Sequence, residues 1–184
     1  MGYLEDIKGF TPLCEQETVD RLLMLEAAER LGDGILVRDS ALMHMTASSM
    51  IINSEHTRVL MAYHNIYASW AWTGGHADGN GNLLEVALKE AKEETGIAHI
   101  RPLWEAPVSL EILTVKSHVK RGRYVPSHLH LNVTYALWGD EGDAVEVKPD
   151  ENARVGWLDI DTLHDFVAER DMHGIYDKII SRMR

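Results

Sequence analysis

Residues 74–97 read GGHADGNGNLLEVALKEAKEETGI, and the fold can be inferred outward from this stretch. The apolar segment WAWTGG ends at the two glycines, a glycine-rich turn follows, and a segment with helical periodicity comes next. Apolar side chains recur in that segment three and four positions apart, at Leu84, Ala87, Leu88 and Ala91. This spacing predicts a helix over Leu83–Thr95 that docks one face on a sheet and ends at Gly96.

The predicted helix carries three carboxylates close together. Glu90, Glu93 and Glu94 stand at positions i, i+3 and i+4, so all three lie on neighbouring parts of one face. Like charges at this spacing repel, and a hard divalent cation such as Mg²⁺ or Mn²⁺, which prefers oxygen ligands, would cancel the repulsion. A solvated helix face, partly neutralised by Lys89 and Lys92, is the alternative interpretation.

The flanking sequence alternates between strand and helix patterns. Two β-hairpins are predicted, one from Met43–Asn53 with Val59–His64 and one from Ser109–Val119 with His128–Trp138. The segment VGWLDI predicts a short strand. Helical periodicity predicts a helix over Glu15–Leu31, ended by Gly32 and Gly34, and another that starts near an N-cap at Asp161 and breaks around Gly174. Interleaved helices and strands indicate a single mixed α/β layer structure.

Composition excludes several classes of protein. A chain of 184 residues corresponds to one domain, and 45% apolar with 26% charged residues is typical of a soluble globular protein. The net charge of −11 disfavours nucleic acid and anionic membranes as partners unless divalent cations reverse the local sign. The single cysteine, Cys14, favours a reducing cytoplasmic location, and we expect neither a signal peptide nor a membrane anchor.

The stretch from Gly75 to Ile97 resembles the Nudix box of the Nudix hydrolase superfamily, G-x5-E-x7-R-E-U-x-E-E-x-G-U, where U is aliphatic. Gly75 aligns with the opening glycine, Glu90 with the glutamate after the arginine, and Glu93 and Glu94 with the paired glutamates. The order of elements is also similar over roughly residues 40 to 170. The resemblance implies a Nudix-like α/β/α sandwich with a mixed β-sheet, formed by residues 39–184, behind an N-terminal helical extension at residues 1–38.

The resemblance also implies a function. It indicates hydrolysis of a diphosphate linkage in a nucleoside diphosphate derivative, such as ADP-ribose or a nucleotide sugar, with Mg²⁺ or Mn²⁺. Glu90 and Glu94, assisted by the Gly74 carbonyl, are the expected metal ligands. Glu93 is expected to be a further ligand or the general base, and Glu151 is a second candidate for the base. The expected substrate contacts come from the box and from a basic segment: Gly75, His76, Arg121 and Arg123.

Two positions depart from the family pattern. Gly81 stands where the family has its first glutamate, and Lys89 stands where it has arginine, so a brace between loop and helix is lost. Asp78 or Glu85 could pair with Lys89 instead, although lysine cannot form a bidentate fork. The departures motivate an alternative, a Nudix-like nucleotide-binding or regulatory module without catalysis. An isomerase resembling isopentenyl diphosphate isomerase ranks lower because it would need a cysteine near the glycine loop.

Other residues allow two interpretations each. His128 and His130 share a strand face, where they could bind a transition metal or hydrogen-bond to neighbours. Trp70 and Trp72 could stack a nucleobase or pack in the core. The basic segment from Lys120 to Arg123 could close over substrate phosphates or form an exposed hairpin tip. The helix over Glu15–Leu31 could pack across a homodimer or cover one end of the sheet.

Overall fold

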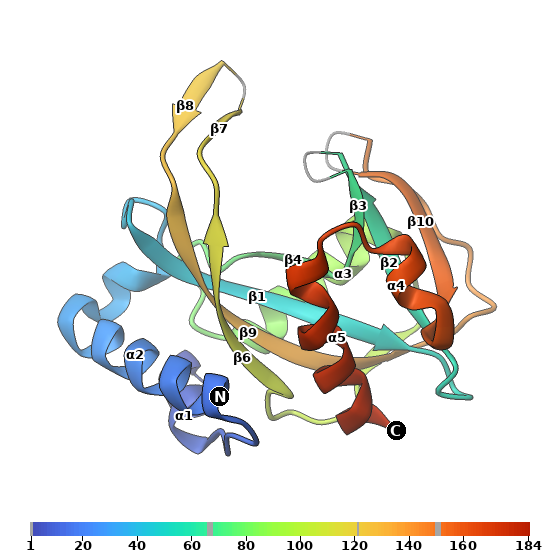
Figure 1. Ribbon diagram of the computed structural model, residues 1–184, viewed down its shortest axis with the longest axis horizontal. Coiled ribbons are helices and arrows are strands. Elements are labelled where there is room, and N and C mark those ends of the chain that lie inside the picture. Colours follow the sequence, from blue (N-terminus) through green and yellow to red (C-terminus); the bar gives the residue numbers. More distant parts are fainter. Residues whose placement is uncertain (1, 66–67, 121, 150–151) are drawn as a thin grey trace.

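The computed structural model describes residues 2–65, 68–120, 122–149 and 152–184 (Figure 1). The helices are α1 (Tyr3–Gly9), α2 (Glu15–Leu31), η1 (Gly32–Leu36), α3 (Leu83–Thr95), η2 (Ile160–Thr162), α4 (Leu163–Phe166) and α5 (Arg170–Met183). The strands are β1 (Met43–Ile52), β2 (Arg58–His64), β3 (Ser69–Ala71), β4 (Thr73–His76), β5 (Ile100–Pro102), β6 (Ser109–Val115), β7 (His118–Lys120), β8 (Arg123–Val125), β9 (His128–Gly139) and β10 (Asn152–Asp159). No described helix is both long enough and apolar enough to cross a lipid bilayer.

Strand β1 lies at the centre of the main sheet. The strand order is β10-β2-β1-β9-β5, and β3, β4 and β6 pair with β2, β1 and β9 respectively. The pair β1 and β9 is parallel over ten residues, whereas the other pairs in this sheet are antiparallel. Strands β7 and β8 form a separate hairpin that projects as an arm from the body (Figure 1). The sheet is mixed, as predicted.

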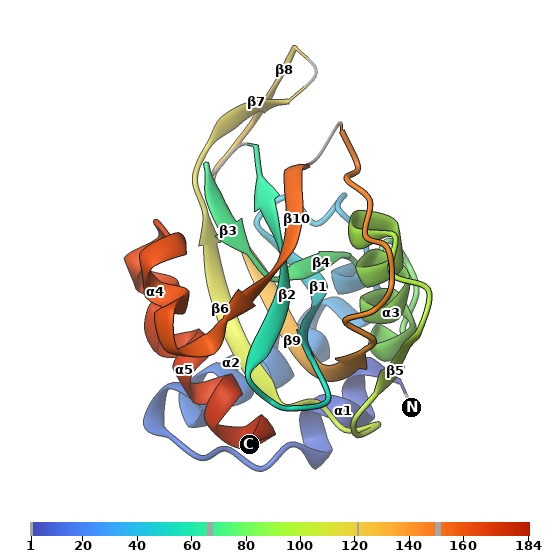
Figure 2. The same cartoon turned by 90° about the vertical axis from the view of Figure 1, so that its right-hand side faces the viewer.

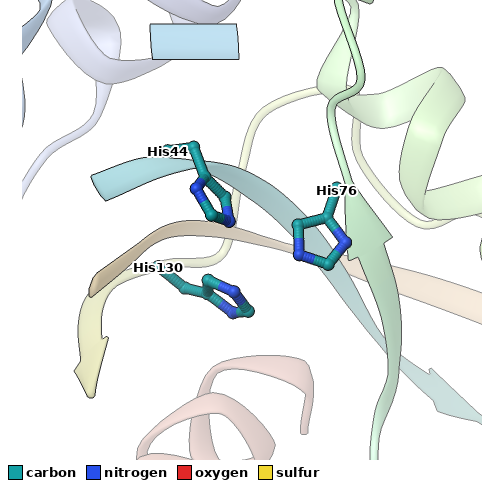
Figure 3. Close-up of side chains that lie close together, drawn as sticks. All are labelled: His44, His76 and His130. Carbon is teal, nitrogen blue, oxygen red and sulfur yellow. The ribbon is translucent and has the colours of Figure 1, made fainter. Parts of the chain in front are cut away.

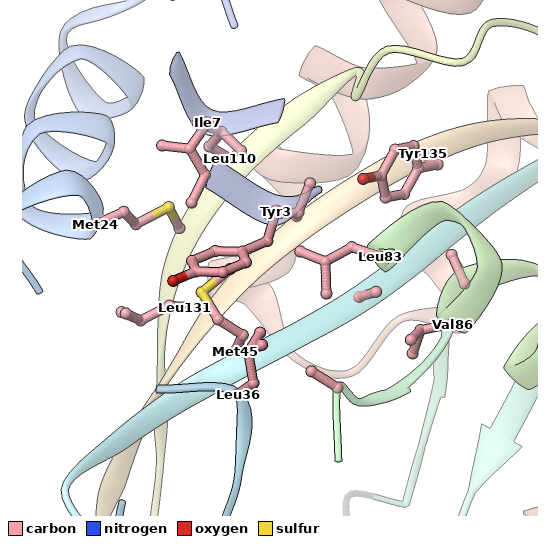
Figure 4. Close-up of a cluster of buried hydrophobic side chains, with 14 of the residues drawn as sticks. Tyr3, Ile7, Met24, Leu36, Met45, Leu83, Val86, Leu110, Leu131 and Tyr135 are labelled. Carbon is pink, nitrogen blue, oxygen red and sulfur yellow. The ribbon is translucent and has the colours of Figure 1, made fainter. Parts of the chain in front are cut away.

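Helices cover both faces of the sheet, with α3 on one side and α4 and α5 on the other (Figure 2). Side chains of β1 point alternately to two separate cores. Met45, Ala47 and Ile51 belong to the core shared with α1, α2 and α3 (Figure 4). Met50 and Ile52 belong to the core shared with α4 and α5. This arrangement confirms the predicted α/β fold class and the three-layer sandwich.

Helix α3 forms where the periodicity placed it. The Asn82 side chain accepts a hydrogen bond from the Glu85 N–H (3.3 Å) and caps the first turn. Gly96 ends the helix in the left-handed conformation, at φ 68°, which favours glycine. The bounds of α2, Glu15–Leu31, also match the prediction, and both predicted hairpins are present as antiparallel pairs.

The C-terminal prediction is wrong in two details. The helix breaks between α4 and α5 at residues 167–169, while Gly174 lies inside α5. Asp161 is not an N-cap, because it lies in η2 and pairs with Arg184, and Thr162 precedes α4. Burial explains the continuity of α5, since Tyr176, Ile179, Ile180 and Met183 beyond the glycine are buried and their burial outweighs the cost of roughly 1 kcal/mol for glycine in a helix.

The N-terminal segment contains a further helix, α1, that the sequence patterns did not indicate. Tyr3, Ile7 and Phe10 are buried in the first core, and the Tyr135 hydroxyl of β9 donates to Asp6 (2.8 Å). Helix α2 covers the outer edge of β6, where Gln16 donates to the Leu110 carbonyl (3.0 Å). The structure therefore places α2 against the sheet. Its role in a homodimer, and the division of the chain at residue 38, stay predictions.

A buried ion-pair cluster, consisting of Glu17, Glu111, Lys178 and Arg182, joins α2, β6 and α5. Arg182 donates to both carboxylate oxygens of the fully buried Glu17 (2.6 and 2.8 Å). Burial alone would raise the pKa of Glu17, but hydrogen bonds from Arg182, the Leu13 N–H and Lys178 outweigh burial and lower the pKa to about 2. Glu17 is therefore ionised at neutral pH, and its buried charge is stabilised by Arg182 and Lys178.

We predict that Arg182→Met lowers the free energy of unfolding by about 3–5 kcal/mol, because it leaves Glu17 buried with much of its charge compensation removed. Urea denaturation followed by circular dichroism measures the change. Arg30→Met, which removes an exposed pair with Glu26, should cost less than about 1 kcal/mol. The double variant Glu17→Met/Arg182→Met should be more stable than Arg182→Met alone, and equal costs for the Arg182 and Arg30 variants would contradict the prediction.

Candidate functional site

A cavity of about 630 Å³ opens on the sheet between α3, α5 and the base of the β7–β8 arm. Its walls carry two groups of chemically active side chains. One group is the carboxylates of α3, Glu90, Glu93 and Glu94, with the main chain of Gly74 and Gly75. The other is a histidine cluster, formed by His44, His76, His128 and His130.

The three carboxylates differ in exposure. The side chain of Glu90 is 14% exposed, that of Glu93 is 42% exposed, and Glu94 is 7% exposed. The solvated-face interpretation therefore fits Glu93 but not Glu90 and Glu94. The latter two are held near each other at the cavity wall despite their charge.

The two glycines of β4 lie directly against these carboxylates. The Gly74 N–H donates to Glu94 Oε1 at 3.1 Å. A Cβ added to Gly75 would lie 2.5 Å from the carboxyl carbon of Glu90, closer than any real side chain approaches. Glycine at position 75 allows the main chain to approach Glu90 this closely.

Lysines lie beside the more exposed carboxylate. Lys89 Nζ is 3.3 Å from Glu90 and 3.4 Å from Glu93, and Lys148 Nζ is 3.5 Å from Glu93. The hydrogen bond to Glu90 raises the pKa of Lys89. Carboxylate oxygens at a cavity wall, next to close main-chain atoms, form a donor set suited to a hard divalent cation. Glu90, Glu94 and Gly74 could hold such an ion.

The glycine loop between β4 and α3 is braced by the N-terminal segment. Arg38 forms two hydrogen bonds to the Asp78 carboxylate (2.8 and 2.7 Å). The Gly79 N–H donates to the Leu36 carbonyl (3.0 Å), and the Tyr3 N–H donates to the Gly81 carbonyl (2.7 Å). These contacts hold the loop although Gly81 offers no side chain.

The two residues suggested as substitute partners of Lys89 have other contacts. Asp78 pairs with Arg38, and Glu85 accepts a hydrogen bond from the Asn80 side chain (3.2 Å). The suggestion was wrong because Lys89 lies against the carboxylates of its own helix. The sequence could not show the actual brace, since Arg38 and Asp78 are 40 positions apart.

The predicted substrate-contacting residues fall in different places. Gly75 and His76 line the cavity. Arg123 is exposed on β8 and is not among the residues that line the cavity. Arg121 and the candidate base Glu151 lie outside the described residues. The roles assigned to these residues and to the carboxylates stay predictions.

The two tryptophans pack against aromatic neighbours. Trp72 meets Tyr176 of α5 edge to face, with ring centroids 5.3 Å apart, and also lines the cavity. Trp70 meets Tyr63 in the same manner at 5.9 Å. Both tryptophans pack at the edge of the core shared with α4 and α5.

The pairing of three strands assembles the histidine cluster. His44 of β1 is the register partner of His130 of β9, and His76 ends β4 next to β1. The rings of His44, His76 and His130 face a common space, with centroids 5.0–5.1 Å apart (Figure 3). His128 adds a fourth ring, 4.9 Å from His44. The predicted pair of His128 and His130 is therefore part of a larger cluster.

Burial keeps the inner histidines neutral. Burial, together with the neighbouring rings of His76, His44 and His128, lowers the pKa of His130 to about 3. Burial also lowers the pKa of His44. The sequence pattern indicates no role for His44 and, for His76, only a contact to substrate. Strand alternation could not reveal the cluster, because the parallel register of β1 and β9 decides it.

Comparisons with known proteins agree with the fold. A family model described as NUDIX domain matches residues 43–182. No curated protein matches the chain.

Solved structures of several Nudix proteins share the fold. A NUDIX-family hydrolase from Clostridium perfringens has 17% identity and a TM-score of 0.58, covering 77% of this chain and 98% of its own. The NUDIX domain of Shewanella oneidensis NrtR, complexed with ADP ribose, has 15% identity and a TM-score of 0.53, covering 76% and 88%. An Ap4A hydrolase from C. elegans has 15% identity and a TM-score of 0.52, covering 76% and 96%.

We predict that Arg38→Ala loosens the glycine loop without unfolding the protein. The pair with Asp78 is half exposed, so its loss should cost about 1 kcal/mol or less and speed local opening about two- to fivefold. Hydrogen exchange of the Gly79 amide measures this change. Arg30→Ala is the matched control, and equal exchange rates in both variants would show that Arg38 does not brace the loop.

Proposed function

The chain belongs to the NUDIX domain family, and on that premise we propose that it is a metal-dependent hydrolase of diphosphate linkages. Its substrate would be a nucleoside diphosphate joined to another group. The observation that carries the proposal is the placement of Glu90 and Glu94, recessed in the cavity wall against the Gly74 and Gly75 main chain. A cavity of about 630 Å³ also has the size of a small-molecule site.

The proposed roles follow from exposure and contacts. Glu90 and Glu94, with the Gly74 carbonyl, would hold Mg²⁺ or Mn²⁺. When bound, the cation would neutralise phosphate charge and lower the pKa of water. The more exposed Glu93 would accept the proton of the attacking water, and Lys148 beside it would attract the phosphates. Glu151 is the second candidate for the base.

ADP-ribose is the first substrate to test, because the S. oneidensis NUDIX domain is complexed with it. Dinucleotides such as Ap4A and nucleotide sugars come next. Gly75 and His76 would contact the phosphates, and Arg121 and Arg123 stay the further predicted contacts. We propose a cytoplasmic location, because the lone Cys14 is exposed as a free thiol.

Gly81 and Lys89 favour a second candidate function, a module that binds nucleotides without cleaving them. That candidate depends on loss of the brace between loop and helix. The contacts of Arg38, Leu36 and Tyr3 to the loop supply another brace, so the departure from the family pattern weighs less against catalysis.

We predict that Glu94→Gln reduces hydrolysis at least about 100-fold, since it removes charge worth several kcal/mol in the transition state. Stability should change by less than about 1 kcal/mol, because glutamine can still accept the Gly74 N–H. Nucleotide release from ADP-ribose, Ap4A and nucleotide sugars with Mg²⁺ or Mn²⁺ measures the activity.

Glu29→Gln is the matched control, since Glu29 is exposed on α2 and remote from the cavity in the fold. It should retain full activity. Equal activity of the Glu94 variant and the parent protein would refute the assignment of this site. Tight binding of a substrate with no product released would favour the binding module instead.

We further predict that Gly75→Ala weakens Mn²⁺ binding about tenfold or more, because the new Cβ displaces the Glu90 carboxylate. Electron paramagnetic resonance measures free Mn²⁺ during titration. Gly34→Ala is the control, since an added Cβ there meets nothing within 4 Å. The prediction fails when both variants bind Mn²⁺ as tightly as the parent.

A further inference from the structure

The proposed hydrolysis leaves the histidine cluster without a role beyond a contact to substrate. We propose that His44, His76 and His130 bind a first-row transition-metal ion, with Zn²⁺ as the best match, in the same cavity as the α3 carboxylates. Its nitrogen donor set differs from the oxygen donor set of the carboxylates. The two sites would therefore select different ions, because imidazole suits zinc whereas carboxylate suits Mg²⁺ and Mn²⁺.

The donor atoms are already close together. One ring nitrogen from each of His44, His76 and His130 lies within 4.8 Å of the others. Nitrogens bound to one tetrahedral Zn²⁺ are about 3.3 Å apart, given Zn–N distances of about 2.0–2.1 Å. Small side-chain rotations would close the difference. The main chain would not need to move, because β1, β4 and β9 are held in one sheet.

The hydrogen bonds of His44 orient it as a ligand. Its Nδ1–H donates to the Ser40 carbonyl (3.2 Å), so the other nitrogen, Nε2, carries the lone pair. Nε2 is buried and has no hydrogen-bond partner among the described residues, and the whole residue is only 4% exposed. Leaving a buried acceptor unsatisfied is costly, and a metal ion would satisfy it. Donation of the second ring nitrogen to a carbonyl is also typical of metal-bound histidine.

His128 repeats this pattern at the edge of the cluster. Its Nδ1–H donates to the Pro126 carbonyl (2.9 Å), so its Nε2 carries the lone pair and accepts a hydrogen bond from His130 Nε2–H (3.2 Å). The rings of His44 and His128, whose Nε2 atoms carry lone pairs, thus lie 4.9 Å apart in a small space that a cation could share.

The position of the site gives it access to the substrate. Three protein ligands leave a coordination position open, and all three histidines line the cavity that the carboxylates line. His76 follows Gly75 directly, so the two donor sets meet at the end of β4. An ion held by the histidines would contact a ligand in the cavity from the sheet side.

The proposal is tested by metal titration of the whole chain after removal of metals with a chelator. Co²⁺ is the spectroscopic probe, and Zn²⁺ competes with it. We expect one Co²⁺ per chain with visible absorption of a nitrogen-ligated ion, displaced by Zn²⁺ but not by Mg²⁺. His44→Gln and His130→Gln should each weaken Co²⁺ binding at least tenfold. Zn²⁺ should raise the melting temperature of the parent and not of these variants.

Two control variants separate this site from others. His99→Gln alters the other group of side chains among the described residues that could hold a metal ion, which consists of His99, Asp140 and Asp143 and is largely exposed. This variant should leave Co²⁺ affinity unchanged. Glu94→Gln should lose hydrolysis and keep the Co²⁺ spectrum, so failure of the proposed hydrolysis is distinguishable from failure of this site.

Unchanged Co²⁺ affinity in His44→Gln and His130→Gln would overturn the proposal, as would loss of the spectrum in Glu94→Gln. Circular dichroism checks that each variant folds. His76→Gln replaces any variant that does not, because His76 is only partly buried.

Discussion

The parallel pairing of β1 with β9 is the constraint on which the rest of the structure depends. It joins strands from the two halves of the chain over ten residue pairs, from Met43 with Leu129 to Ile52 with Trp138. The remaining edge of β1 receives β4 and β2 in succession. Because side chains alternate along a strand, one register divides β1 between two cores and sets His44 beside His130.

The negative charge of the α3 carboxylates is the second constraint, because packing alone does not remove the repulsion between them. Glu90 and Glu94 are recessed although they repel each other, and the main chain of Gly74 and Gly75 lies against them. Such a wall is suited to a cation. Elsewhere, the fully buried Glu17 is compensated by Arg182 and Lys178 and does not line the cavity.

The N-terminal segment connects the fold to the site. Tyr3, Leu36 and Arg38 contact the glycine loop, and Ile7 and Met24 are buried in the core beneath it. The loop lacks the glutamate that the family pattern places at Gly81. Contacts from residues distant in the sequence hold the loop instead of that side chain. The N-terminal helices are therefore integral to the geometry of the cavity as well as to the core.

The sequence by itself determined the local features. Helical periodicity and Gly96 bound α3, and the spacing of Glu90, Glu93 and Glu94 places them on one helix face, because backbone geometry relates neighbours in sequence. Features that depend on distant pairing required the tertiary structure: the helix α1, the unbroken α5 across Gly174, the Arg38–Asp78 brace and the gathering of four histidines. Burial and strand register, which arise only when the chain has folded, decide these contacts.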